Sequence, residues 1–307
     1  MKSPKVTIII PTHNRADILP RAIKSVQAQT FQDYELIIID DASTDETDQV
    51  MKGIVSDKIR YIKLDKNQGQ CVARNRAYQK ARGEYIGFLD SDDEWMPEKL
   101  EKQLRLFEHS KTEKLAAVYC GFIEVDELTN KTHVINRDNI RGNIYKDLLK
   151  GFCPSSTSMF LIKSKVFKEV LGFDEQLVTF VDYDLWLRIS KAGYIFDYVD
   201  EPLIVKYEHF GPQIAKNLDK RLKGLSQLLT KWCSEMERID GKGACRRFRK
   251  NKIEAVAKSI IENPVEQTRK DIKKSVQLLW QVSSIKLRLY AKGILFLLYG
   301  RSFKLKH

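Results

Sequence analysis

Three carboxylates fall within four positions of the chain, at Asp90, Asp92 and Asp93. They follow residues 85–89, an apolar and aromatic run without charge, which is typical of a strand buried on both faces of a parallel sheet. Their mutual repulsion is costly unless a cation lies among them, and a hard divalent ion shared with substrate phosphates meets that need. Acidic residues are also common in polar turns, so this cluster alone leaves both interpretations open.

Polar side chains follow two earlier apolar runs, residues 6–10 and 35–39, in the same way. They are Pro11, Thr12 and Asn14 after the first run, and Asp40 and Asp41 after the second. For Asp40 and for the nearby Asp45, we favour capping of the following helix. Three turns nevertheless carry polar groups at the ends of three predicted strands, which favours one shared site.

Strand, polar turn and helix alternate four times over the first 95 residues, which predicts βαβ units and a mostly parallel α/β sheet. Ligands of such open sheets bind beyond the carboxyl ends of the strands. Further along, residues 116–121 and 155–162 are predicted strands, and residues 123–135 are a predicted hairpin that covers the site. The elements therefore place all three polar turns at one edge of the sheet.

The chain has 307 residues, of which 43% are hydrophobic and 31% are charged, as in ordinary folded proteins. This length fits one large domain, or a domain with a substantial appendage. The five cysteines are scattered without CxxC spacing, which favours free thiols in a reducing compartment over a disulfide framework or a zinc site. The first apolar run is too short for a cleavable signal, so we expect a cytoplasmic protein.

The net charge of +12 is concentrated in the last third of the chain. Residues 1–212 hold 30 Lys and Arg against 33 Asp and Glu, a balance of −3, whereas residues 213–307 hold 23 against 8, a balance of +15. The strand pattern also stops there, and the predicted helices are residues 213–236, 246–262, 264–282 and 285–299. We therefore expect one domain over residues 1–212 and a basic helical region over residues 213–307.

The last predicted helix, residues 285–299, combines Leu, Phe and Tyr with Lys and Arg. Its apolar part is much shorter than the ~20 residues of a membrane span. A basic amphipathic helix is typical of peripheral contact with an anionic membrane, here the inner face of the plasma membrane. A solvated helical cap and a homo-oligomer formed through these helices stay open, and no recognised module accompanies the charge to suggest a nucleic-acid partner.

Four motifs, in order and spacing, resemble the family 2 inverting glycosyltransferases of the GT-A fold. They are residues 6–15 (VTIIIPTHNR), residues 36–45 (LIIIDDASTD), residues 67–75 with NQG and ARN, and residues 83–93 (GEYIGFLDSDD). The resemblance covers about residues 4–210. It implies a Rossmann-like, mostly parallel sheet flanked by helices, with residues 1–95 as the nucleotide-sugar-binding half and residues 96–212 as the acceptor-binding half.

The resemblance also implies a nucleotide-diphosphate sugar as the donor, often a UDP-sugar. The residues implied to bind it are Pro11, Thr12, Asn14, Asp41, Asn67, Gly69, Arg74, Asp90 and Asp92. Asp41 stands where a carboxylate accepts the imide N–H of the base, and Gly69 lets the backbone turn close to the ligand. Arg74 is implied to pair with the acidic cluster or with the diphosphate.

Mn²⁺ or Mg²⁺ is the implied cofactor, bridging the diphosphate of the donor. The implied metal ligand is Asp93, and Asp92 holds the ribose hydroxyls, although an offset of one residue leaves either of them open as the main ligand. His209 ends a run that resembles the strand after which the family often has a His near the metal. A lone His is equally often an ordinary surface or core residue.

Residues 181–186 read Val-Asp-Tyr-Asp-Leu-Trp, similar to the family's Glu-Asp-x-Asp-Leu-Trp motif, whose first Asp is the catalytic base. Asp182 stands at that place, while Val181 replaces the usual Glu. Inversion at the anomeric carbon needs one base that takes the acceptor's hydroxyl proton on the face opposite the leaving diphosphate. Asp184, in the first turn of the predicted helix, is expected to be structural.

These inferences together predict a metal-dependent inverting hexosyltransferase. It moves one sugar to a hydroxyl of a glycan or lipid-linked oligosaccharide in surface polysaccharide synthesis. A sugar-phosphate nucleotidyltransferase is one alternative, but it needs a Gly-rich loop after the first strand, and residues 11–15 contain no Gly. A catalytically silent nucleotide- or glycan-binding scaffold is the other, and the intact Asp92, Asp93 and Asp182 argue against it.

Overall fold

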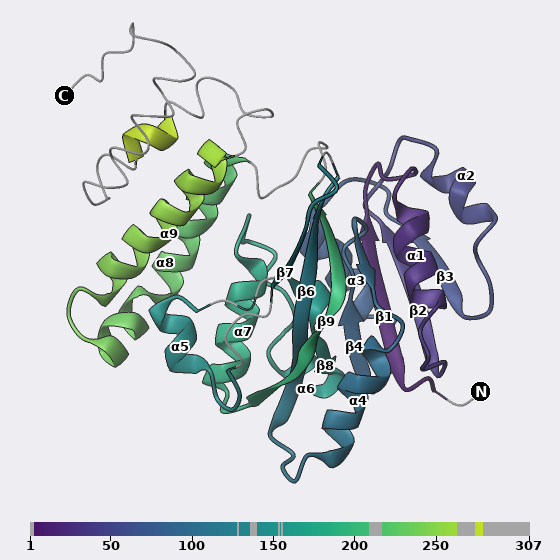
Figure 1. The fold of residues 1–307 in the computed structure, drawn as a ribbon, viewed down its shortest axis with the longest axis horizontal. Helices are drawn as coiled ribbons and strands as arrows, with labels where there is room; N and C mark the ends of the chain where they lie inside the picture. The colour runs from purple at the N-terminus through teal and green to yellow at the C-terminus, as the bar shows by residue number, and fades with distance from the viewer. Residues whose placement is uncertain are drawn as a thin grey trace, which may run out of the picture. The chain divides into compact units, whose positions relative to one another are not determined.

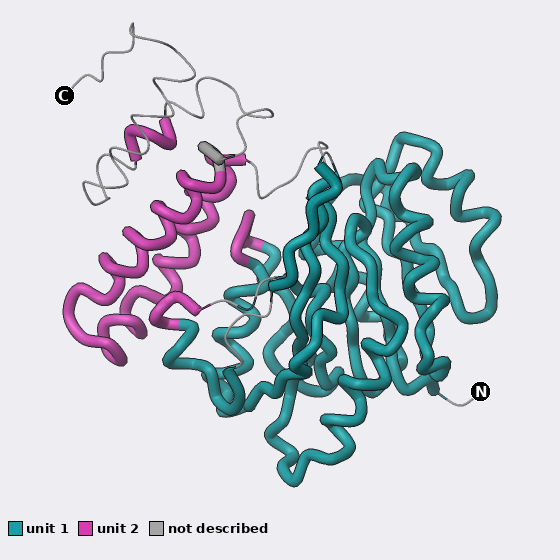
Figure 2. Tube along the Cα trace, in the orientation of Figure 1, with its two compact units in different colours: residues 1–148, 153–175, 181–209 teal, residues 149–152, 176–180, 210–307 magenta. Residues whose placement is uncertain are grey.

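The computed structural model describes residues 3–127, 129–135, 140–152, 154, 156–208, 217–262 and 274–278. The chain divides into two compact units (Figure 2). Unit 1 comprises Met1–Leu148, Cys153–Glu175 and Val181–His209, and unit 2 comprises Leu149–Phe152, Gln176–Phe180 and Phe210–His307. Two short segments of unit 2 thus lie within the first 212 residues, and the single division expected at residue 212 stays a proposal.

One mixed sheet forms the centre of unit 1, with the strand order β3-β2-β1-β4-β8-β6-β9-β5 and β7 paired with β6 (Figure 1). The strands are β1 (Val6–Thr12), β2 (Tyr34–Asp40), β3 (Ile59–Lys63), β4 (Tyr85–Phe88), β5 (Asp93–Trp95), β6 (Leu115–Asp126), β7 (Thr132–Ile135), β8 (Leu161–Lys163) and β9 (Ile195–Glu208). Strands β1 to β4 are all parallel, as expected for the first half. Among the described strands of the second half, only β6 and β9 pair in parallel.

Helices connect the parallel strands and cover the sheet. They are α1 (Leu19–Gln27), α2 (Thr47–Lys52), α3 (Gln70–Tyr78), α4 (Lys99–His109), α5 (Tyr145–Lys150), α6 (Ser164–Glu169) and α7 (Val181–Lys191). Helix α3 packs on β1 and β2, while α4 packs on β6 and β9. β2 is buried along its whole length, which explains its uninterrupted Leu and Ile run.

A close contact between β4 and β5 fixes the turn that joins them. The ring of Trp95 lies so near Gly87 that a Cβ at position 87 would stand 2.7 Å from the Trp95 Cη2 atom. The Trp95 indole N–H donates to the Ser158 carbonyl at 2.9 Å. The ammonium of the fully buried Lys99 lies 3.9 Å from the Trp95 ring centroid. Only glycine leaves room for this ring, so β5 is held firmly at its last residue.

The predicted strand over residues 155–162 is wrong for most of its length. Residues Thr157–Met159 form a 3-10 turn, and only the short β8 follows it. The side chain of Ser156 accepts a hydrogen bond from the amide of Ser158 at 3.1 Å. A serine that binds nearby backbone in this way competes with strand pairing, which explains the turn.

Unit 2 contains a pair of helices that lie side by side, α8 (Leu218–Asp240) and α9 (Ala244–Glu262), drawn in green in Figure 1. Leu218 and Val256 form an apolar cluster between them. Both helices were expected, over residues 213–236 and 246–262. Of the predicted helix over 264–282 only residues 274–278 are described, and these are helical, whereas residues 285–299 lie outside the described residues.

The expectation of free thiols is wrong for two cysteines, because Cys233 of α8 and Cys245 of α9 form a disulfide. Their Cα atoms are 5.2 Å apart, within the ordinary range for a bridge. The short turn between the helices brings together two residues that are 12 positions apart in the sequence. Cys71 and Cys120 are free and buried, as expected. Across the residues that the structure describes, every helix is too short or too polar to cross a membrane.

Candidate functional site

The parallel register of the first strands brings their carboxyl ends together. Thr12 at the end of β1 pairs with Asp40 at the end of β2. The amide of Asp41 then donates to the Thr12 carbonyl at 2.9 Å, which joins the two turns beyond the strands. β4 pairs with β1 on its other side, so the acidic turn after β4 belongs to the same edge. The sheet thus gathers the three polar turns as the sequence predicts.

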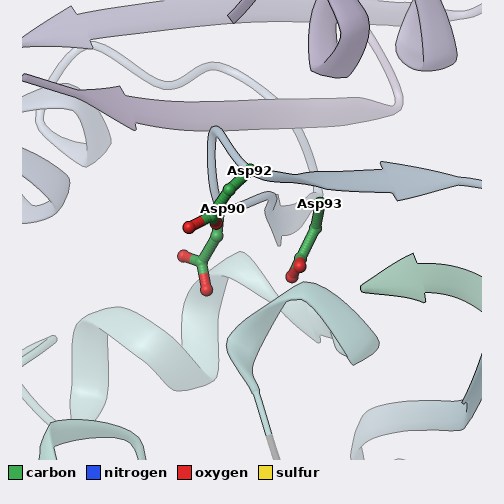
Figure 3. A group of neighbouring side chains, drawn as sticks. All are labelled: Asp90, Asp92 and Asp93. Atoms are coloured by element: carbon green, nitrogen blue, oxygen red, sulfur yellow. The ribbon is translucent and has the colours of Figure 1, made fainter. Parts of the chain in front are cut away.

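The acidic turn carries three side chains that face a common space. The side chains of Asp90, Asp92 and Asp93 project from the turn to the same side (Figure 3). One carboxylate oxygen from each lies within 4.8 Å of the other two. The Asp93 amide donates to the Asp90 carbonyl at 3.0 Å, which closes the turn. Oxygen ligands at this spacing suit a hard divalent cation.

Asp93 is the most informative member of this group. Its side chain is only 3% exposed, and its buried Oδ2 atom has no hydrogen-bond partner within the described part of the chain. Burial, together with the charges of Asp90 and Asp92, raises the pKa of Asp93 to about 8, against the opposing charge of Lys206. An orphaned carboxylate oxygen beside two more acids is what a metal ligand looks like without its cation, so these residues fit Mn²⁺ or Mg²⁺.

Asp90, in contrast, already has protein partners for both oxygens. The buried Arg74 donates from Nη2 to Asp90 Oδ1 at 2.5 Å, and Ser156 Oγ donates to Oδ2 at 3.1 Å. The amide of Asp90 donates to Ser158 Oγ at 3.0 Å. Asp90 therefore orients the turn through α3 and the 3-10 turn, which leaves Asp92 and Asp93 as the better candidates to hold a cation.

The predicted nucleoside side lies around Asp41. Its two oxygens accept the amide N–H groups of Gln68 and Gly69, each at 2.7 Å. Gly69 has a positive φ of 88°, which glycine adopts without strain, and it leads into α3. The hydroxyl of Thr12 is buried and lacks a hydrogen-bond partner in the described part of the chain. A buried hydroxyl at a strand end needs a partner, and a bound ligand can supply one.

The remaining predicted donor residues are placed as follows. Pro11 lies within β1, just before the buried hydroxyl of Thr12. Asn14 has a positive φ of 52°, and its side-chain oxygen accepts the amide of Thr44 at 2.8 Å, which ties the first turn to the second. Asn67 is exposed in the loop before α3. These three residues border the same edge of the sheet.

Asp40 and Asp45 have structural partners. The fully buried Asp40 accepts hydrogen bonds from Ser43 Oγ at 2.6 Å and Tyr61 Oη at 2.5 Å, so it braces the loop and does not cap a helix. The expected helix cap is therefore wrong for Asp40, whose carboxylate points back to β3. Asp45 accepts the amide of Thr47, the first residue of α2, at 3.2 Å, although the N-cap position itself is Glu46.

The predicted base, Asp182, lies in the first turn of α7 and belongs to unit 1. Its Oδ1 accepts the amide of Tyr183 at 2.8 Å. Burial raises the pKa of Asp182, the positive charge of Arg74 opposes the rise, and the charge of Asp90 adds to it. Asp182 is therefore coupled electrostatically to the Arg74–Asp90 pair of the acidic turn. The neighbouring Asp184 is fully buried and pairs with Arg188 at 2.8 Å, in agreement with a structural role.

The sequence reasoning missed two residues of this region. Asn75 of α3 clamps the turn before α7, because its side chain donates to the Phe173 carbonyl at 2.9 Å and accepts the Phe173 amide at 3.0 Å. Lys206 of β9 stands opposite Asp93 in the sheet register. A lysine directly after the apolar residues 203–205 was the available signal for it. His209, the third predicted metal ligand, lies outside the described residues.

The sequence matches the family model for glycosyl transferase family 2 over residues 7–171. An uncharacterized glycosyltransferase of Rickettsia felis is 32% identical over 241 residues, 76% of this chain and 39% of that protein. The glycosyl transferase WcaA of Escherichia coli strain K12, named for colanic acid biosynthesis, is 30% identical over 253 residues, 78% of this chain and 85% of that protein. The chain thus spans only about two fifths of the length of the relatives from Rickettsia felis and Rickettsia conorii.

Two solved structures share the fold. TarS 1-349 of S. aureus, in complex with UDP-GlcNAc, superposes with a TM-score of 0.62 at 17% identity, covering 94% of this chain and 88% of that one. The mannosyltransferase PcManGT of Pyrobaculum calidifontis, in complex with GDP-Man and Mn²⁺, gives 0.59 at 18% identity, covering 97% and 82%. The expected α/β GT-A fold with a helical C-terminal region is confirmed. With a family match over more than half of its residues, the chain belongs to glycosyl transferase family 2.

Proposed function

We propose that this protein is a metal-dependent inverting hexosyltransferase. It moves one sugar from a nucleotide-diphosphate sugar, with a UDP-sugar favoured, to a hydroxyl of a glycan or lipid-linked oligosaccharide in surface polysaccharide synthesis. Support for the donor comes from the two solved relatives, which were bound to UDP-GlcNAc and to GDP-Man with Mn²⁺. Support for the pathway comes from WcaA, which is named for colanic acid biosynthesis.

The single observation that carries the proposal is the orphaned oxygen of Asp93 in a cluster of three acids. Asp93, with Asp92 beside it, would hold a Mn²⁺ or Mg²⁺ ion, and Asp90 would keep the turn in place through Arg74. When bound, the ion supplies charge neutralisation for the leaving diphosphate. Asp41, Thr12 and the loop at Gly69 would hold the nucleoside, at the strand edge where such sheets bind ligands.

Asp182 is the proposed catalytic base. The carboxylate takes the proton from the acceptor hydroxyl as that oxygen bonds to the anomeric carbon and the bond from that carbon to the diphosphate oxygen breaks. Burial raises the pKa of Asp182, which makes it a stronger proton acceptor than an ordinary aspartate while the charge of Arg74 helps keep it ionised. Attack on the face opposite the diphosphate inverts the configuration of the sugar.

An Asp182→Asn substitution separates binding from chemistry. We expect donor binding in Mn²⁺ to stay within about threefold of wild type, while turnover falls by about 10²–10⁴, the usual contribution of a general base. The donor is first identified by thermal shift and hydrolysis with a panel of UDP- and GDP-sugars, in Mn²⁺ and in chelator. Asp184→Asn is the matched control for loss of a carboxylate from the same helical turn. Turnover near wild type in the Asp182 variant would show that Asp182 is not the catalytic base.

Two alternative functions make different predictions for the same site. A silent binding scaffold has no need of a carboxylate with a raised pKa at the position of Asp182, and donor hydrolysis by the wild type would exclude it. A sugar-phosphate nucleotidyltransferase would release pyrophosphate from a nucleoside triphosphate and a sugar phosphate. A pyrophosphate assay with the same protein therefore distinguishes the two enzymes.

We further propose peripheral contact with an anionic membrane on the cytoplasmic side, which suits a lipid-linked acceptor. The balance of +15 over residues 213–307 supports it, as do the exposed Arg246, Arg249 and Lys250 of α9. Homo-oligomer formation through the C-terminal helices is the competing use of this region. Sedimentation with anionic and neutral vesicles, before and after truncation ahead of Ile285, tests the membrane, and light scattering tests the oligomer.

A further inference from the structure

A lysine lies in the middle of the acidic site, on the central strand of three. β9 runs between β5 and β6, and the register places Lys206 opposite Asp93 on one side and opposite Glu124 on the other. Residues paired across neighbouring strands project to the same face of a sheet. Asp93, Lys206 and Glu124 therefore form a row of alternating charge on one face.

Lys206 also interacts electrostatically with the acidic cluster. The charges of Asp93, Asp90, Asp92 and Glu124 all raise the pKa of Lys206, although burial acts in the opposite direction. In return, the charge of Lys206 is the main influence that lowers the pKa of Asp93. The Nζ atom lies 5.4 Å from the ring centroid of Phe122, which lies on β6 two residues before Glu124. The register thus places a cationic side chain on the same face of the sheet as Asp93 and Glu124.

The other charges of the site indicate which group Lys206 can bind. Arg74 neutralises Asp90 at 2.5 Å, so a divalent ion between Asp92 and Asp93 leaves that part of the site close to neutral. The diphosphate of the donor then adds about two negative charges that still need a cation. A lysine ammonium is a mobile point charge on a flexible stem, well suited to binding phosphate oxygens.

We propose that Lys206 is a donor-binding residue that contacts the diphosphate of the nucleotide-sugar, alternating between the carboxylates of the empty site and the phosphate oxygens of the occupied one. This inference rests on the proposed function, because it needs a nucleoside diphosphate group next to the acidic turn. Beside the divalent ion, the other positive charge that the diphosphate needs would then come from Lys206. The neighbouring Glu124 then holds the lysine in place when no donor is present.

The test compares two affinities that a donor-binding lysine should move in opposite directions. In Lys206→Gln, calorimetry with Mn²⁺ alone should show affinity equal to or up to about tenfold above wild type, because a repelling cation is gone. The affinity for UDP or GDP in Mn²⁺ should fall by about tenfold or more, because a charge-assisted contact is lost. Lys206→Arg should restore most of the nucleotide affinity. Lys102→Gln, which breaks a surface pair with Glu201, should change neither affinity.

Three outcomes of this test would contradict the role of Lys206. If wild type binds UDP or GDP in Mn²⁺ and Lys206→Gln binds it equally well, this inference is wrong and the proposed function stands. Loss of both Mn²⁺ and nucleotide affinity, with a lowered melting temperature, would make Lys206 a structural residue and also overturn the inference. If wild type binds neither nucleotide with Mn²⁺ present, the proposed function fails together with the inference.

Discussion

Two buried carboxylates of unit 1 show how differently the same group is used. Glu35 is 2% exposed, and its oxygens accept hydrogen bonds from Thr7, from the backbone and side chain of Arg82, and from Arg60. Burial alone would raise the pKa of Glu35, but these donors outweigh it and lower the pKa. Asp93 is 3% exposed, yet one oxygen is orphaned and its pKa is raised to about 8. A buried carboxylate whose oxygens are hydrogen-bonded stabilises the fold, whereas a buried carboxylate oxygen without a partner is available to bind a ligand.

Glu35 predicts a specific dependence of stability on pH. Because its pKa is lower in the folded state, its contribution is complete well above the ordinary value of 4.5 and is lost as the pH falls through the folded-state pKa. Glu35→Gln should therefore cost about 2 kcal/mol of unfolding free energy near pH 7 and progressively less as the pH falls through the lowered folded-state pKa. Urea titrations of both proteins across this range measure the difference. A cost that does not change with pH would contradict the assignment.

At the scale of elements, Arg21 of α1 joins the acidic turn to the β6–β7 hairpin. Its guanidinium lies 2.9 Å from Glu127 and 3.4 Å from Glu94, and it donates to the Asp92 carbonyl at 3.3 Å. Its Cζ also stands 3.6 Å from the ring centroid of Tyr207 on β9. One side chain thus contacts the acidic turn, the strand of Lys206 and the loop of the hairpin that the sequence suggests as a cover.

Substitution of Arg21 should loosen these elements together. In Arg21→Gln we expect faster amide hydrogen exchange in residues 123–135 and a donor KM several-fold above wild type, because the turn that carries Asp92 loses a support. Arg105→Gln, which removes an exposed pair with Glu101 on α4, is the matched control. Unchanged exchange in the hairpin would show that Arg21 does not hold it.

At the scale of the whole molecule, the sequence predicts well wherever one local pattern decides the structure. Strand, polar turn and helix alternate along this half of the chain, and the Ile-rich runs of β1 and β2 are typical of strands buried on both faces of a parallel sheet. The strand edge with its carboxylates was therefore predictable. Register across distant strands was not, which is why Lys206 opposite Asp93 became visible only in the sheet. The Cys233–Cys245 bridge and the bond from Tyr61 to Asp40 were also hidden, because each joins two different elements whose packing the local patterns do not show.

On the proposed function, the acidic turn holds a divalent cation together with the diphosphate of the donor. Calorimetry of UDP and GDP binding, with Mn²⁺ and with chelator, tests it in wild type and in Asp93→Asn. Asparagine keeps the size of the side chain, so the fold should survive while the charge that attracts the cation is lost. We predict binding in wild type that depends on Mn²⁺ and falls by about 10²-fold or more in the variant. Equal nucleotide affinity in the two proteins, or binding unaffected by chelator, would contradict the account.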